Sequence, residues 1–478
     1  MDELEAHIAS LKAHPELGPL LAPLFALIES QAARIAELEA EVAELKARLA
    51  QTSETSHKPP SSDGYRKKPA IPRVPGARGG QKGHRGDTLK MVAAPDTVDT
   101  EFASACNGCG HRLSEADVID LESRQVFDLP EPRLQVHEYR RGRSRCRRCG
   151  AHTRSSFPDH VRAPVQYGAG VQALCALLHN DYHVPVAKVG QLFRDLFGQA
   201  VNEATVLAAN ARTYEALAAS ETAIRASLKR SALLHVDETG IRAQGCLNWL
   251  HSASNASLSY YFMHHKRGKK ALTSEASLLP GYRGRLVHDC WASYFCFTEA
   301  EHSLCAAHLI RELRALAEQG ACWAEEMIEL FLEAYRLIEE TAVLGRRTYY
   351  QFKHRYLALL RQGLQKHPPL PRKPGQRGRR KRGKARSLIL RLIRYHEAVW
   401  AFACQVEVPF TNNQAERDLR MAKLKQKING GFRTEQGARV FARIRGFCST
   451  ARKQGKHVFK ELAQALHEPD YCIPLCGT

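Results

Sequence analysis

The feature that most constrains the fold is a block of short apolar runs rich in β-branched and aromatic residues. The runs are LLHVDET (233–239), NWLHSAS (248–254), LSYYFMHH (258–265) and, after a short helix-compatible stretch, GRLVHDCW (284–291). Their lengths and compositions are typical of β-strands. The block therefore predicts an α/β unit in which three strands, a crossover and a further strand follow one another.

The first and last of these runs each end on an acid, Asp237 and Asp289 respectively. If the two strands are neighbours, both carboxylates emerge at the same edge of the sheet, where their repulsion costs stability unless a cation lies between them. Side chains alternate along a strand, so Asp237 and Glu238 point to opposite faces and only one can join Asp289. We choose Asp237 as the ligand, with Glu238 as the alternative.

A third acid lies in PFTNNQAERDLRMAKLKQK (409–427), where Asn412 or Asn413 would cap a helix and Glu416 lies about one turn inside it. Asn413 and Glu416 also have the spacing of a capping box, so the pattern leaves open whether Glu416 binds a cation or caps its own helix. Basic residues continue along this helix and are candidate DNA contacts: Arg417, Arg420, Lys423 and Lys427.

Two cysteine knuckles, CNGCG and CRRCG, precede the strand block. A glycine after each knuckle lets backbone amides turn toward the thiolates, and four sulfurs in two knuckles suit tetrahedral zinc. The alternative is a chance placement of reduced core cysteines. Arginines crowd the second knuckle, so we expect the zinc to be structural and to hold a basic surface. The predicted ligands are Cys106, Cys109, Cys146 and Cys149, and the predicted DNA contacts there are Arg145, Arg147 and Arg148.

Charge points to a polyanionic partner. Lysine and arginine number 70 against 50 aspartates and glutamates, which gives a formal charge of +20 and makes nucleic acid the first candidate. Residues 51–94 are rich in Pro, Gly, Ser, Lys and Arg and cannot bury enough apolar area to order themselves, so they predict a flexible arm. This arm either follows DNA or is simply a soluble linker. Its candidate DNA contacts are Arg78, Lys82 and Arg85.

Two helical patterns precede the strand block. Apolar residues recur in alternating steps of four and three, with Gln31 as the exception: Leu24, Ile28, Ile35, Leu38, Val42, Leu45 and Leu49. This pattern predicts a coiled-coil dimer seam; the alternative is an amphipathic helix packed on its own protein. Residues from about 167 to 231 predict three helices, which fit a helix-turn-helix DNA reader or a small helical bundle equally well. No stretch is apolar and long enough to cross a bilayer, so we expect a cytoplasmic, nucleoid-associated protein.

Four residues at intervals of three follow the strand of Asp289 and are expected to share one face of a helix: His302, Cys305, His308 and Arg311. This spacing also fits a buried cysteine beside a packed histidine, and we expect no second zinc site there.

The motifs HVDETG, LVHDCW, CAAHLIREL and TNNQAERDLR, together with the seam, the KPPSSDG arm and the paired knuckles, resemble the bacterial transposases of insertion sequence family 66. The resemblance implies a ribonuclease-H-like catalytic domain whose Asp, Asp, Glu triad corresponds to Asp237, Asp289 and Glu416. It also implies two magnesium or manganese ions on these carboxylates, a helical insertion between Asp289 and Glu416, and accessory proteins encoded by the same element.

The insertion would carry RKPGQRGRRKRGKAR (372–386), in which nine of fifteen residues are basic, as a mobile loop that neutralises phosphates. Its candidate contacts are Arg379, Arg380, Lys381 and Arg382. The predicted order of domains is a coiled-coil dimerisation segment at 1–50, a basic arm at 51–94, a zinc-binding domain at 95–165, a helical domain at 166–231, a first catalytic part at 232–318, the helical insertion at 319–407 and C-terminal catalytic helices at 408–478.

The expected function is that of a DNA transposase, a homodimer or higher oligomer that binds the ends of an insertion sequence, cleaves the strand and transfers it. One alternative is a zinc-containing DNA-binding regulator derived from a transposase and lacking cleavage activity. Another is a nuclease for structured nucleic acid that shares the site and performs no strand transfer.

Overall fold

The computed structural model describes residues 14–15, 17–49, 88–369 and 382–475. They divide between two compact units, one drawn from 1–65, 163–189 and 203–478, the other from 66–162 and 190–202. None of the described helices is long and apolar enough to cross a membrane.

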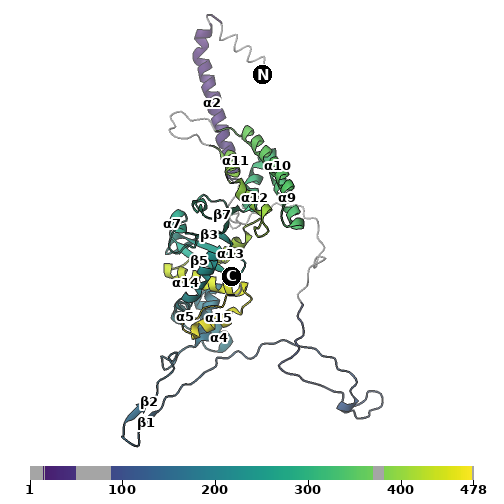
Figure 1. The fold of residues 1–478 in the computed structure, drawn as a ribbon, viewed down its shortest axis with the longest axis vertical. Coiled ribbons are helices and arrows are strands. Elements are labelled where there is room, and N and C mark those ends of the chain that lie inside the picture. The colour runs from purple at the N-terminus through teal and green to yellow at the C-terminus, as the bar shows by residue number, and fades with distance from the viewer. Residues whose placement is uncertain (1–13, 16, 50–87, 370–381, 476–478) are drawn as a thin grey trace. The chain divides into compact units, whose positions relative to one another are not determined.

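A five-stranded mixed sheet with the order β5-β4-β3-β6-β7 forms the centre of the first unit (Figure 1). Its first three strands form an antiparallel meander, and the last two run parallel to β3. The mixed α/β architecture, with three strands, a crossover and a further strand, is confirmed. The strands are β3 (Leu233–Ala243), β4 (Cys246–Ser254), β5 (Ser259–His264), β6 (Arg285–His288) and β7 (Glu301–Leu304).

Strand β3 is longer than its apolar run predicts, because it continues past Asp237 to Ala243. It turns into β4 through Gln244 and Gly245, which both have positive φ, as a two-residue hairpin turn requires. The acid therefore lies within a strand and does not end it.

The fifth strand corrects a second expectation. His302 lies in β7, and the helix that follows, α8 (Ala306–Ala317), begins only after Cys305. His302 therefore does not share a helical face with His308 and Arg311.

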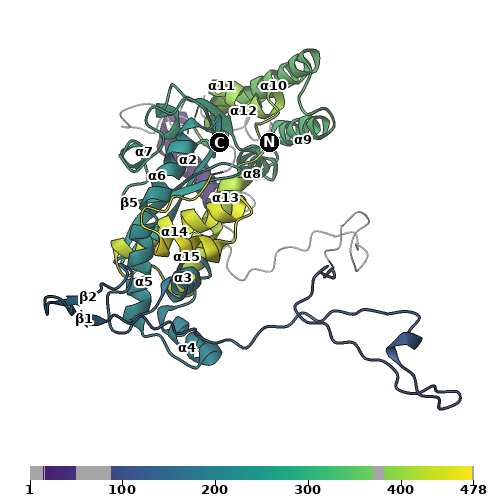
Figure 2. The ribbon, with the colours of Figure 1, turned by 60° about the horizontal axis from the view of Figure 1, so that its bottom comes forward.

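Helices cover the sheet on both faces (Figure 2). Ile241 and Leu250 pack with Leu419 of α13 (Asn413–Asn429) and Phe441 of α14 (Glu435–Lys453). Leu234 and Val236, whose positions alternate with that of Ile241 along β3, belong to another core that contains Ile224 and Leu228 of α6 (Ala218–Arg230). The side of β3 that presents Asp237 is thus the side covered by α13.

The region from 167 to 231 contains more elements than predicted. The first expected helix is α3 (Ala169–Ala176), which continues as one π-helical turn, η3 (Leu177–Asp181). The second is α4 (Val186–Phe197), and the long third helix is divided at Leu217 into α5 (Glu203–Ala216) and α6. Three further elements of the first unit are α7 (Lys269–Leu272), η4 (Tyr294–Cys296) and α15 (Val458–His467).

Between β7 and α13 the chain forms helices around a second core that contains the buried Trp323 and Trp400. The basic segment was expected to be a loop as far as residue 386, but a helix already starts at Lys384. Within this helix, Arg386 donates to the carbonyls of Leu364 and His367. Besides α8, these helices are α9 (Cys322–Thr341), α10 (Arg346–Lys366), α11 (Lys384–Arg394) and α12 (His396–Cys404).

The N-terminal seam lies on one continuous helix, α2 (Leu17–Leu49), which includes Pro23. Five of its seam residues are exposed, and dimerisation through the seam stays a prediction: Leu24, Ile28, Ile35, Leu38 and Val42. The second unit contains a short helix, η2 (Glu115–Asp117), and a two-stranded antiparallel sheet, β1 (Arg143–Arg145) with β2 (His152–Arg154).

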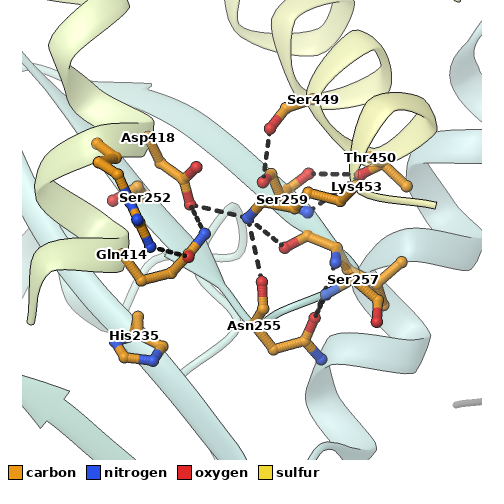
Figure 3. Close-up of polar contacts among 12 residues, drawn as sticks. His235, Ser252, Asn255, Ser257, Ser259, Gln414, Asp418, Ser449, Thr450 and Lys453 are labelled. Atoms are coloured by element: carbon orange, nitrogen blue, oxygen red, sulfur yellow. Dashed lines mark hydrogen bonds and ion pairs between the residues drawn. The ribbon is translucent and has the colours of Figure 1, made fainter. Parts of the chain in front are cut away.

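A buried ion pair fixes α13 against α14 and the turn between β4 and β5 (Figure 3). Lys453 Nζ lies 2.9 Å from Asp418 Oδ2 and also donates to the carbonyls of Asn255 and Leu258. The side chains of Lys453 and Asp418 are only 15% and 8% exposed. Replacing one partner therefore leaves the other as an uncompensated buried charge.

We predict that Lys453→Met lowers the free energy of unfolding by about 3–5 kcal/mol, since Asp418 loses its cation in a dry environment. Denaturant titration of the purified chain measures this. Arg283→Met breaks the exposed pair with Glu299, whose side chains are 82% and 61% exposed, and is the control, expected to cost less than about 1 kcal/mol. Equal losses in the two variants would contradict the assignment.

Candidate active site

Asp237 and Asp289 are brought opposite each other by strand register. In the parallel pair of β3 and β6, His235 is the partner of Val287. Two residues further along both strands come Asp237 and Asp289, on the same face because side chains alternate with period two. Strand β6 ends at His288, so Asp289 lies just past its carboxyl end while Asp237 remains within the longer β3. The condition on which the sequence argument depended, that the two strands are neighbours, is therefore met.

A chain of imidazoles fixes the turn that carries Asp289. Cys290 has φ 71°, and its amide donates to His288 Nδ1 at 3.2 Å. His288 Nε2 must then carry the proton that bonds His302 Nδ1 at 3.1 Å, and His302 Nε2 donates to the Phe297 carbonyl. Burial lowers the pKa of both histidines, which agrees with neutral rings.

Asn412 attaches the start of α13 to β3 beside Asp237. Its Nδ2 donates to the Val236 carbonyl at 3.0 Å, and its Oδ1 accepts from His235 Nδ1 at 2.8 Å. Its backbone amide donates to the sulfur of Cys305 at 3.1 Å. Asn412 is buried, and its side chain makes no capping bond to the helix.

This geometry decides the question of the capping box. The N-cap of α13 is Asn412 and Asn413 is already helical, so Glu416 does not have the capping-box position. The Glu416 carboxylate instead faces α8, where Oε1 lies 3.8 Å from His308 Nε2 and 3.9 Å from Arg311 Nη2. Cys305 and His308 thus both support the start of α13: the sulfur of Cys305 accepts from the Asn412 amide, and His308 lies beside the Glu416 carboxylate.

The surroundings of Asp237 oppose its ionisation. Burial raises the pKa of Asp237 well above its ordinary value, and the negative charges of Glu238, Asp289 and Glu416 raise it further. The amide of Glu238, which donates to Asp237 Oδ1 at 2.8 Å, partly opposes this rise in pKa. A cation among these oxygens would reverse the sign of the interaction.

Both carboxylate oxygens of Glu238 already accept hydrogen bonds, so Glu238 is less available than Asp237 to bind a cation. Its Oε1 accepts from Arg267 Nε at 2.7 Å and its Oε2 from the Tyr294 hydroxyl at 2.5 Å. Burial and Asp289 raise the pKa of Glu238, while Tyr294 and Arg267 oppose this. These contacts favour Asp237 over Glu238 as the acid that faces Glu416.

The two cysteine knuckles have the same backbone geometry. The amides of Gly110 and Gly150 each donate to the carbonyl of the first knuckle cysteine at 2.9 Å, and both glycines have positive φ, 73° and 77°. Backbone amides lower the pKa of Cys106 and Cys146, as the glycine after each knuckle leads one to expect. Within the described residues, no three Cys, His, Asp or Glu side chains are gathered into a metal-binding group, so neither the four sulfurs nor the three acids are drawn together as ligands.

The residues predicted to contact DNA differ in their exposure to solvent. Arg145, Arg147, Arg148, Arg417, Arg420 and Lys427 are exposed, and Arg382 is partly exposed. Lys423 is partly buried and donates to the Gly240 carbonyl at 3.3 Å, so it also holds α13 on β3. The others lie outside the described residues: Arg78, Lys82, Arg85, Arg379, Arg380 and Lys381.

Sequence reasoning missed the roles of Asn412 and Arg267. Asn412 was considered only as a cap, although its position four residues before Glu416 would also suit a tether for the helix that carries this acid. Arg267 lies in the turn after β5, and nothing in the residues around it signals an ion pair with β3.

Comparison with known protein families gives three matches. The transposase IS66 family matches residues 164–440, which is more than half of the 478-residue chain. The zinc-finger binding domain of transposase IS66 matches 103–150, and a family of unknown function (DUF6444) matches 1–90. No curated protein matches the sequence. The first match spans both aspartates and Glu416, the second spans both knuckles, and the chain belongs to the transposase IS66 family.

Proposed function

We propose that this chain is an active transposase that cuts and joins DNA with Asp237, Asp289 and Glu416 as its catalytic acids. The observation that carries the proposal is the meeting of β3, β6 and α13. Strand register aligns the two aspartates, and Asn412 fixes the start of the helix that carries Glu416 against the same strand. Asp289 and Glu416, remote from Asp237 and from each other in sequence, both lie within electrostatic reach of Asp237.

The sheet supports a ribonuclease-H-like catalytic domain. Three antiparallel strands are followed by two strands parallel to the first, and the acids lie on β3 and just after β6. The helices α9 to α12 would be the insertion that separates Asp289 from Glu416 in the sequence. The proposed domain limits remain those given above, with catalytic parts at 232–318 and 408–478 around an insertion at 319–407.

The donor set fits hard divalent cations, because it consists of carboxylate oxygens whose mutual repulsion a cation would relieve. Asp237, Asp289 and Glu416 would hold magnesium or manganese. When bound, two such ions supply an activated water or 3′ hydroxyl and stabilise the leaving oxygen of an in-line phosphoryl transfer. Arg311 and His308 hold the Glu416 side chain from α8, and the imidazole chain holds the Asp289 turn.

DNA is the proposed partner. The exposed arginines of the second knuckle and the exposed basic residues of α13 would neutralise phosphates of the element's ends and of the target. Exposed apolar residues of α2 would pair with a second copy as a coiled coil, and accessory proteins of the same element remain proposed partners.

For the cysteines we propose one structural zinc, held by Cys106, Cys109, Cys146 and Cys149. The support is the repeated knuckle geometry, with amides directed so that thiolates are favoured, and a donor set that is typical of closed zinc sites.

A regulator without cleavage activity explains the charge and the knuckles equally well. It gives no reason to retain Asp237 in surroundings that raise its pKa so far, because an uncharged residue there would make the fold more stable. The placement of the acids therefore favours the enzyme.

We predict that Asp237→Asn lowers magnesium-dependent nicking of a supercoiled plasmid bearing the element's ends by more than about a hundredfold, since loss of a metal ligand exceeds the usual effect of losing an outer partner. Gel analysis of nicked and joined products measures this and separates strand transfer from simple cleavage.

Asp470→Asn makes the same substitution at an exposed residue and should leave nicking unchanged. Without metal, Asp237→Asn should unfold no more readily than the native chain, because it removes a charge from a crowded site. Full nicking by Asp237→Asn, or intact end binding with no nicking by the native chain, would overturn the proposal.

We predict that Cys146→Ser, or removal of zinc by a chelator, weakens binding to the element's ends while the first compact unit, which contains the three acids, stays folded, since the four cysteines belong to the second unit. Electrophoretic mobility shifts and circular dichroism measure the two properties. Cys246→Ser changes an exposed cysteine at the hairpin of β3 and β4 and is the control. Loss of binding and of helix content together would contradict the separation.

A further inference from the structure

A stacked cluster lies next to the acids on the other face of β3. The guanidinium carbon of Arg267 lies 4.3 Å from the ring centre of Trp291 and 5.0 Å from that of Trp249. Glu238, whose side chain is fully buried, holds the Nε of this arginine at 2.7 Å. Tyr294 donates to the second oxygen of Glu238 and so fixes the carboxylate from the opposite side.

The cluster fixes the side chain of Arg267 but bonds only one of its N–H donors. A guanidinium has five N–H groups, and Glu238 takes only the one at Nε. Among the residues that the structure describes, no hydrogen bond or ion pair reaches the two terminal nitrogens of Arg267, and its side chain is 40% exposed. Aromatic stacking lowers the entropy that the side chain loses when these nitrogens bind an anion.

The cluster is linked directly to the turn of the second acid. The amide of Trp291 donates to Asp289 Oδ1 at 3.0 Å, while its indole ring contacts Arg267. Trp249 lies in β4 opposite Gly240, three residues beyond Asp237 on β3. A DNA strand whose phosphate lies at the acids would pass this edge of the sheet, and a planar guanidinium suits the oxygens of a neighbouring phosphate.

We propose that Arg267 is a phosphate-binding residue for the DNA strand being cut, and that Glu238 is its positioning residue rather than a metal ligand. The inference rests on the proposed function, since it names how the same site takes its substrate. It explains why an acid adjacent to Asp237 is buried against an arginine and a tyrosine.

The test is the salt dependence of DNA binding by the full chain. Fluorescence anisotropy with a nicked, mixed-sequence duplex in calcium-containing buffer gives the affinity at several salt concentrations. Each phosphate contact contributes about 0.9 to the slope of log affinity against log salt. Arg267→Gln should reduce the magnitude of this slope by about 0.9 and weaken binding at low salt by about tenfold.

Arg283→Gln is the matched control, because it removes the same charge from an exposed residue just before β6, at the opposite end of that strand from Asp289. It should leave the slope unchanged. Arg267→Lys keeps the cation but loses the planar stack, so its slope should equal the native slope while binding is weaker at every salt concentration.

A native slope in Arg267→Gln, or an equal loss in Arg283→Gln, would overturn the assignment. If Arg267→Gln does not fold, as judged by its melting curve, the affinity of Arg267→Lys decides: weaker binding than native at every salt concentration supports the contact, and native affinity contradicts it. Binding in calcium requires no cleavage, so a chain that fails to nick DNA in magnesium still gives a clear result here.

Discussion

The site depends on the hydrogen bonds of Asn412 more than on any other single contact. Helix α13 begins more than a hundred residues after β6, yet its first turn must lie against the middle of β3. The apolar contacts of Leu419 and Ala422 alone would let the helix shift along the strand. The two side-chain bonds to Val236 and His235 remove that freedom, because each needs a specific donor or acceptor. The bond from the Asn412 amide to Cys305 adds α8 to the same junction. At the far end of α13, Phe432 exchanges backbone bonds with Arg242 and Gln244, so the continuation of β3 past Asp237 serves to hold the helix.

Rigid attachment has an electrostatic cost. It keeps Asp237 among three other carboxylates, and the protein offsets only some of that charge: Arg267 and Tyr294 take up Glu238, while Arg311 and His308 lie nearly 4 Å from Glu416. Asp237 forms no ion pair among the described residues: Lys423, whose pKa burial lowers against the opposing effect of the charge of Asp237, donates instead to the Gly240 carbonyl. Such a balance is typical of sites that are completed by a bound ion, where stability is given up for function.

Much of this could be predicted from the sequence, and the limits have physical causes. The apolar runs that precede Asp237 and Asp289 indicated buried strands, because burial on both faces produces continuous apolar sequence, whereas the pairing of these two strands is a property of the fold. The helix of Glu416 was also predictable, since its polar and apolar residues recur with helical spacing. Strand β7 was missed because EHSL has no alternation of its own and is ordered by pairing with β6. The N-cap position of Asn412 was predictable, but the capping-box spacing of Asn413 and Glu416 was misleading, because the helix starts at Asn413 and the side chain of Asn412 bonds to β3 instead of capping. The role of Glu238 depended on Arg267, which only the fold brings to β3.

Three acids distant in the sequence are proposed to share divalent cations at the junction of β3, β6 and α13. The most direct measurement is the location of manganese by anomalous scattering in crystals of the full chain soaked with the ion. We expect anomalous peaks within coordination distance of Asp237, Asp289 and Glu416, with none on Glu238. Peaks elsewhere, or a crystal structure in which Glu416 stays out of range of the two aspartates when the ion is bound, would contradict this proposal.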